Sequence, residues 1–267
     1  MPAVLSLEMI MHRKSSFVVT TLILSMLVLS ACNLPDRQII QSQTPTSTSI
    51  ALPEPSPTPV SLCSNQYFPS GLGDTWEYSG SNSAIGAYNR TDTVTRSSAE
   101  GFRVSTILAD VTYEVNYGCS AAGLTANDPI QQYAGALLSG PNAPVNVKLT
   151  SNSGITLPAK IAPGDTWQQT ADFKASSQDL NVNGRFVFDY TSVGYENVTV
   201  PFGTFYALRV DATIRVEVSA FRVLAGTYTT STWMVPEVGT IKSEGTSHVS
   251  GIDFTDGMQL AGFSPAP

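Results

Sequence analysis

Apolar and polar residues alternate with a period of two along much of the second half of the chain. From Arg209 to Val218, every even-numbered residue is apolar and every odd-numbered residue is polar. Phe186, Phe188 and Tyr190 alternate with their neighbours in the same way. This period is typical of strands with one buried and one solvent-facing side. The pattern predicts an all-β, mainly antiparallel fold.

Turn residues separate most of the predicted strands. Asn183-Gly184 predicts a type I′ hairpin turn, and Pro201-Phe202-Gly203 predicts a turn between two strands. One short helix is expected, capped by Asp128 and stopped by Gly140-Pro141. Further strands are predicted at 75–79, 91–96, 102–108, 112–118, 145–149, 166–174, 193–200, 227–235 and 239–244.

The first 31 residues follow a different pattern. A basic cluster at His12-Arg13-Lys14 precedes an apolar run of 13 residues, Phe17–Leu29. A membrane-spanning helix needs about 20 apolar residues, so this order indicates a secretory signal peptide. A short membrane anchor or a buried helix is the alternative interpretation.

The signal ends in Leu29-Ser30-Ala31-Cys32, which resembles the bacterial lipobox. The resemblance implies that Cys32 becomes the lipid-modified first residue of the mature chain, held at a membrane outside the cytoplasm, at the cell surface or in the periplasm. Two or three acyl chains suffice for stable anchoring. We therefore expect a signal peptide at 1–31, a lipid anchor and disordered tether at 32–61, and a β-rich globular domain at 62–267.

The predicted tether contains six prolines and nine serines or threonines between residues 33 and 61. Few apolar side chains are available there, so no core can form. The proline alternation from Pro53 to Pro59 favours an extended polyproline spacer, with a motif for a proline-binding partner as the alternative.

Charge and cysteine content narrow the predicted role further. Without residues 1–31 the chain has twelve basic and twenty acidic residues, a net charge near −8, which disfavours nucleic-acid binding.

Lipidation uses Cys32, which leaves Cys63 and Cys119 outside the cytoplasm. An even pair there predicts one disulfide, with two buried thiols as the alternative.

Three stretches of the domain resemble those of bacterial envelope lipoproteins. The resemblance implies an incomplete β-barrel or strongly curved sheet, similar to the lipoprotein carriers of the LolA and LppX type, which bind acyl chains on a concave apolar face. It implies no catalytic residues. The stretches are 67–78, 198–210 and 233–243, and the first contains Gly73-Asp74-Thr75-Trp76, which is repeated as Gly164-Asp165-Thr166-Trp167. A duplicated half-domain or chance reuse of a turn would explain this repeat.

The sequence contains few candidate catalytic or metal-binding residues. His248 is the only histidine after the signal, lies five residues before Asp253 and lacks a nucleophile motif, so a surface position on a strand is expected. Asp179, Asn181 and Asn183 match the first half of a calcium loop. The glutamate required at its twelfth position is Tyr190, so the same residues fit a hairpin better. No cofactor is expected.

These observations favour a non-enzymatic, envelope-anchored lipoprotein that binds an apolar ligand or lipid. A structural or adhesive envelope module that binds glycan or protein is the alternative, and a hydrolase is a minor one.

Overall fold

The computed structural model describes residues 61–84, 86–109, 111–129, 146–176, 181–218, 226–249 and 252–266. The predicted signal peptide, Cys32 and nearly all of the predicted tether lie outside these ranges, as does the predicted helix after Pro129. No helix in the described ranges is long and apolar enough to cross a membrane.

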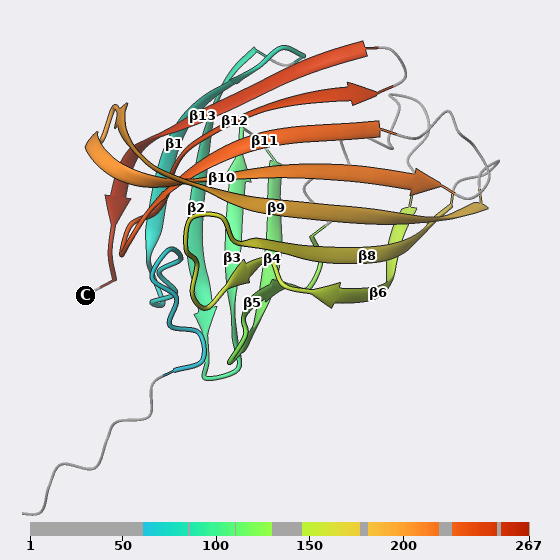
Figure 1. Cartoon of the computed structure of the whole chain (residues 1–267), viewed down its shortest axis with the longest axis horizontal. Coiled ribbons are helices and arrows are strands. Elements are labelled where there is room, and N and C mark those ends of the chain that lie inside the picture. Colours follow the sequence, from blue (N-terminus) through green and yellow to red (C-terminus); the bar gives the residue numbers. More distant parts are fainter. Residues whose placement is uncertain are drawn as a thin grey trace, which may run out of the picture. The chain divides into compact units, whose positions relative to one another are not determined.

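One antiparallel sheet of thirteen strands forms the described fold, and it does not close into a barrel (Figure 1). The strands follow one another in the order β6-β8-β9-β10-β11-β12-β13-β1-β2-β3-β4-β5-β7. They are β1 Thr75–Asn82, β2 Gly86–Ser97, β3 Gly101–Leu108, β4 Val111–Ser120, β5 Gly123–Ala126, β6 Asn146–Gly154, β7 Leu157–Pro158, β8 Thr166–Ser176, β9 Asn181–Val200, β10 Gly203–Val218, β11 Gly226–Val235, β12 Gly239–Val249 and β13 Ile252–Ser264. The predicted all-β class is confirmed.

The alternating pattern identified the buried side of β10 correctly. Val210, Ala212, Ile214 and Val216 are buried, whereas the odd-numbered residues between them are more exposed. The turn at Pro201-Phe202 is also confirmed, since β9 ends at Val200 and β10 begins at Gly203.

The predicted hairpin turn at Asn183-Gly184 is wrong, because both residues lie inside β9. Gly184 pairs with Phe173 of β8, and a Cβ atom at this position would lie 2.4 Å from the Phe173 ring. The glycine therefore makes room for a ring on the neighbouring strand. The connection between β8 and β9 falls between Ser176 and Asn181.

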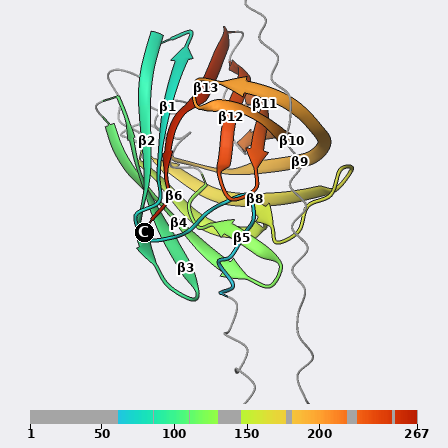
Figure 2. The same cartoon turned by 90° about the vertical axis from the view of Figure 1, so that its left-hand side faces the viewer.

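The sheet is strongly bent, so its two halves cross. In Figure 1, β1–β4 run across the direction of β8–β11, and Figure 2 shows the strong curvature of β9 and β10. The larger core lies between the halves and includes Trp76, Phe102, Leu124, Leu208 and Ile241, all less than 8% exposed. One end of the bent sheet is therefore filled by side chains from both halves.

Side-chain hydrogen bonds bring the two edges of the sheet together at this filled end. Gln169 of β8 is fully buried, donates to the Ala126 carbonyl oxygen at 2.9 Å and accepts from the Thr156 hydroxyl at 2.6 Å. Its Nε2 also donates to Asn152 of β6, whose own amide donates to Ala126. We call these contacts the Gln169 seam. They join β6 and β8 to β5 without a continuous strand ladder.

Candidate functional site: the inner face of the bent sheet

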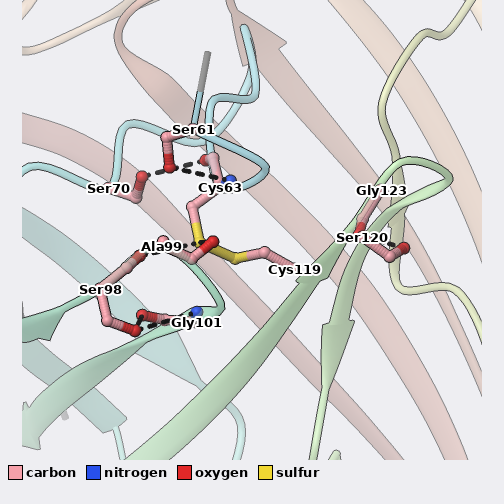
Figure 3. Close-up of a disulfide and its surroundings, with 9 residues drawn as sticks. All are labelled: Ser61, Cys63, Ser70, Ser98, Ala99, Gly101, Cys119, Ser120 and Gly123. Carbon is pink, nitrogen blue, oxygen red and sulfur yellow. Dashed lines mark hydrogen bonds between the residues drawn. A yellow bond between two sulfur atoms is a disulfide. The ribbon is translucent and has the colours of Figure 1, made fainter. Parts of the chain in front are cut away.

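The predicted disulfide between Cys63 and Cys119 is confirmed (Figure 3). The S–S distance is 2.06 Å, and the Cα atoms are 5.0 Å apart. Cys63 is buried against the carbonyl groups of Ser98 and Ala99, while Cys119 lies on β4. The bond fixes the start of the described chain to the first half of the sheet.

A second apolar cluster lies on the inner face of β8, β9 and β10. In the strand register Ala171 lies opposite Phe186, Ala175 lies opposite Val182, and Phe186 lies opposite Val216. The buried residues of this cluster, which we call the β8–β10 cluster, are Ala171, Phe173, Ala175, Val182, Phe186, Phe188, Ile214 and Val216. All its described residues, including the partly buried ones packed against it, belong to β6 and β8–β11. It therefore forms a second buried apolar core on one half of the sheet, with its buried residues at most 8% exposed.

A partly buried ion pair lies on the inner face of β2, with the Arg90 side chain 22% exposed and the Asp92 side chain 11% exposed. The Arg90 guanidinium donates to both carboxylate oxygens of Asp92, at 2.9 and 2.8 Å, and the Thr106 hydroxyl donates to the same carboxylate at 2.7 Å. Nη1 of Arg90 lies 3.9 Å from the Met258 sulfur, which is a weak acceptor. Burial alone lowers the pKa of Arg90, but Asp92 outweighs it and the net shift is upward. The guanidinium stays charged.

Tyrosines surround this ion pair. Arg90 lies over the Tyr78 ring, and the Tyr88 hydroxyl donates to Asp256 at 3.0 Å. Burial is the largest cause that raises the pKa of Tyr88, Tyr113 and Tyr228. Burial likewise raises the pKa of Tyr117 and Tyr190. Since Tyr190 and Tyr228 also pack against the β8–β10 cluster, polar hydroxyls and apolar side chains adjoin on one inner face.

Glycines make space for two of these rings. A Cβ atom on Gly80 would lie 2.4 Å from the Tyr88 ring, and one on Gly245 would lie 2.2 Å from the Tyr228 hydroxyl. Both tyrosines therefore lie flat against neighbouring strands. Sequence reasoning missed Arg90 and these tyrosines as a group, although Arg90 and Asp92 share the strand face of the buried Val94.

The outer face of β8–β12 is polar and carries ion pairs. Arg185 pairs with Asp172, Arg209 with Asp211, and Lys242 with Glu244. A hollow of about 650 Å³ on this face is lined mainly by serine and threonine, with Asp211 and Glu244 among its residues. Asp211 and Glu244 are both in ion pairs, and most of the other lining side chains carry hydroxyl groups. The hollow therefore offers little apolar surface to an apolar ligand.

The remaining predicted site residues do not come together. Asp179 lies outside the described residues, and Asn181 and Asn183 pair with β8 at Ser176 and Lys174. No group of three or more histidine, cysteine or acidic side chains within the described ranges could hold a metal ion. His248 contacts Asp253 at 2.6 Å across the β12–β13 pair, and both side chains are exposed.

The aromatic residues of the β9–β10 hairpin are unusually exposed. Tyr195 and Tyr206 stack with their ring centroids 5.4 Å apart, and Phe202 stacks on Phe205 at 6.0 Å. Tyr206 is 65% exposed and Phe202 is 41% exposed. We call the exposed side chains of Val193, Tyr195, Phe202 and Tyr206 the hairpin patch.

Comparison with solved structures supports the fold. The chain is similar to a candidate exported protein with a YmcC-like fold from Bacteroides fragilis, with 13% identity, 75% of this chain and 100% of that chain covered, and a TM-score of 0.50. A candidate lipoprotein from Parabacteroides distasonis has 14% identity, coverage of 75% and 99%, and a TM-score of 0.46. The hypothetical lipoprotein YmcC from Escherichia coli has 10% identity, coverage of 78% and 90%, and a TM-score of 0.34.

No protein-family model and no curated protein sequence matches the chain. At 13% identity, the Bacteroides fragilis structure shows a shared fold and leaves function open. The likeness to LolA- and LppX-type carriers stays a prediction. The fold of this chain is thus similar to the YmcC-like fold.

Proposed function

We propose that this chain is an envelope-anchored lipoprotein that binds an apolar ligand, such as an acyl chain, on the inner face of its bent sheet. The observation that carries the proposal is the β8–β10 cluster, in which Phe173, Phe186 and Val216 form one apolar surface across three strands. The buried residues of the cluster are at most 8% exposed without a ligand, so an acyl chain would have to displace the protein atoms that cover them. Apolar surface gains about 25 cal/mol per Å² when it is covered, so the ligand must cover at least as much of it as the atoms that it displaces.

The charged and hydroxyl groups beside the cluster support a ligand with a polar end. Arg90 keeps its charge, and its Nη1 faces only the weak acceptor of Met258 among its described partners. A carboxylate or phosphate oxygen is a much better acceptor for a guanidinium. An amphiphile could therefore place its chain on the cluster and its polar end near Arg90.

Native mass spectrometry of the full chain, extracted from membranes in mild detergent, tests this proposal. We expect a bound species whose mass matches a lipid or fatty acid and which is lost when the protein is unfolded. A covalent acyl anchor at Cys32 would survive unfolding, so the two kinds of lipid are distinguishable. A folded chain that carries no releasable apolar molecule would contradict the proposal.

An adhesive or structural envelope module remains the second candidate, and the hairpin patch is the observation that favours it.

A further inference from the structure

The hollow of about 650 Å³ on the outer face of the sheet lies over β10, β11, β12 and β13 and reaches β1. These strands lie side by side in the sheet (Figure 1). Sites for small molecules typically have volumes of about 300–1,000 Å³, so the hollow has room for a ligand of that size. We call it the outer hollow. Two rows of residues, each paired from strand to strand, line it.

The first row consists of four threonines on four strands. In the register Thr213 lies opposite Thr229, Thr229 opposite Thr246, and Thr246 opposite Thr255. The Thr229 hydroxyl donates a long hydrogen bond of 3.5 Å, and the hydroxyls of the other three have no partner among the residues that the structure describes. A threonine hydroxyl both donates and accepts hydrogen bonds. The row therefore presents open donors and acceptors about 4.5–5.5 Å apart, the spacing of paired strand residues.

The second row contains two carboxylates that are held in ion pairs. Asp211 accepts from Arg209 at 2.8 and 3.0 Å and from the Ser231 hydroxyl at 2.7 Å. Glu244 contacts Lys242 at 2.8 Å through one oxygen, and its side chain is 57% exposed. A carboxylate can accept about four hydrogen bonds, so both acids keep free acceptor sites. The contacts to Arg209 and Ser231 also fix the orientation of Asp211 before any ligand arrives.

A glycine opens the middle of the second row. Gly257 on β13 pairs with Glu244 on one side and Ser81 on the other, without a bulge at this position. Its φ is not positive, and a Cβ atom there would be no closer than 3.7 Å to any neighbour. The fold would thus accept a side chain at 257, although glycine weakens a strand. A strand glycine of this kind often marks a place where a ligand approaches closely.

We propose that the outer hollow binds a neutral saccharide. Sugar hydroxyls donate and accept hydrogen bonds, so they match the threonine row and the acidic acceptors together. An anionic ligand would meet the charges of Asp211 and Glu244 and of Asp256, which also borders the hollow. A cationic ligand would have to compete with Arg209 and Lys242 for the same carboxylates. The site lies on the face opposite the β8–β10 cluster and is independent of any apolar ligand there.

Saturation-transfer NMR of the full chain tests the proposal directly. The probes are the neutral trisaccharides maltotriose, cellotriose and chitotriose, with trigalacturonate as the acidic counterpart, all at millimolar concentration. We expect saturation transfer to at least one neutral trisaccharide and none to trigalacturonate. The absence of transfer to all three neutral probes would overturn the proposal. Transfer to trigalacturonate as strong as that to the best neutral probe would overturn it as well.

Filling the hollow at its glycine tests where the saccharide binds. Gly257→Leu would place a side chain between the two neighbouring strands in the outer hollow, and we expect it to abolish saturation transfer while the thermal unfolding midpoint is not lowered. The matched control is Gly262→Leu on the same strand, outside the hollow, where a Cβ atom meets only the flexible end of Glu77. This control should keep the transfer. Unchanged transfer in the folded Gly257→Leu variant would contradict the proposed site.

Removing hydroxyls without changing the size of the side chains tests the threonine row. We expect the paired substitutions Thr213→Val and Thr246→Val to weaken binding several-fold in a titration with the best neutral trisaccharide. Thr199 and Thr204 form a similar exposed pair at the β9–β10 turn, where their hydroxyls are 3.0 Å apart. Thr199→Val with Thr204→Val should therefore leave binding unchanged. Equal binding by the two double variants would show that the threonine row does not hold the saccharide.

Discussion

Asp74 and Asp165 occupy the same place in two copies of one turn. The Asp74 carboxylate accepts from the Gly71 amide at 2.6 Å, and the Asp165 carboxylate accepts from the Ala162 amide at 2.7 Å. Each aspartate also accepts, through its carbonyl oxygen, a 2.9 Å backbone hydrogen bond from the second strand beyond the turn. The repeated Gly-Asp-Thr-Trp sequence thus forms the same hydrogen-bonded turn at the starts of β1 and β8.

The two aspartates should contribute unequally to stability. Asp74 is buried and also accepts from the Ala266 amide at 2.7 Å, whereas Asp165 is exposed. We expect Asp74→Ala to lower the free energy of unfolding by about 2–3 kcal/mol and Asp165→Ala by about 1 kcal/mol. Urea unfolding of both variants measures the difference. Equal losses would show that burial and the Ala266 contact contribute nothing.

The disulfide should be a major contributor to stability. Its cysteines are 56 residues apart, and closing such a loop stabilises the folded state by about 4 kcal/mol in the chain-entropy account. Paired Cys63→Ser and Cys119→Ser substitutions should lower the midpoint of thermal unfolding markedly. A reducing agent should do the same to the native chain and have no effect on the double variant. A reductant-sensitive double variant would contradict this explanation.

Gln169 should be required for the seam between the edges of the sheet. Gln169→Ala removes one hydrogen bond each from the Ala126 carbonyl, the Thr156 hydroxyl and the Asn152 amide oxygen, although the Ala126 carbonyl still accepts from the Asn152 amide. We expect a loss of about 3 kcal/mol, at about 1 kcal/mol for each hydrogen bond removed. Gln168→Ala is the matched control, since its exposed side chain contacts Asp189 on the outer face. Similar losses in the free energy of unfolding for Gln169→Ala and Gln168→Ala would show that the Gln169 seam does not stabilise the fold.

The buried tyrosines predict how stability depends on alkaline pH. Burial is the main cause that raises the pKa of Tyr78, Tyr117 and Tyr190 above the ordinary value of 10.0. A group whose pKa is raised by folding stabilises the folded state fully below its unfolded pKa, and this contribution is lost as pH increases above it. We expect tyrosinate absorbance from these residues to increase only together with unfolding, above about pH 10. Their titration in a fully folded chain would contradict this prediction.

The sequence alone predicted the features that depend on local alternation and on cysteine counting. The strand at Arg209–Val218, the turn at Pro201-Phe202 and the Cys63–Cys119 pair are examples. Features that depend on contacts across the sheet could not be predicted. Asn183-Gly184 has the sequence of a turn, but the pairing of Gly184 with Phe173 on β8 places it inside a strand. Gln169 has the polarity of a surface residue, but its hydrogen bond to Ala126 across the edges of the sheet places it in the interior.

The last strand shows a second reason for failure. β13, Ile252–Ser264, was not predicted, because Gly257 and Gly262 interrupt its alternation. Its register with β1 shifts between Glu77 and Tyr78, so the apolar residues change phase along the strand. Arg90 was missed because charged residues on a strand are usually solvent-facing, and only the bend of the sheet places it inside.

The most direct measurement of the central claim compares ligand content in two alanine variants. Ala175 in the β8–β10 cluster and Ala207 in the main core are both fully buried. Both substitutions should cost about 1–3 kcal/mol by overpacking, so Ala207→Phe controls for the loss of stability. If a ligand binds at the β8–β10 cluster, Ala175→Phe should also exclude it, so the bound apolar molecule disappears from the native mass spectrum of this variant and remains in that of Ala207→Phe. Unchanged ligand content in the folded Ala175→Phe variant would contradict the account.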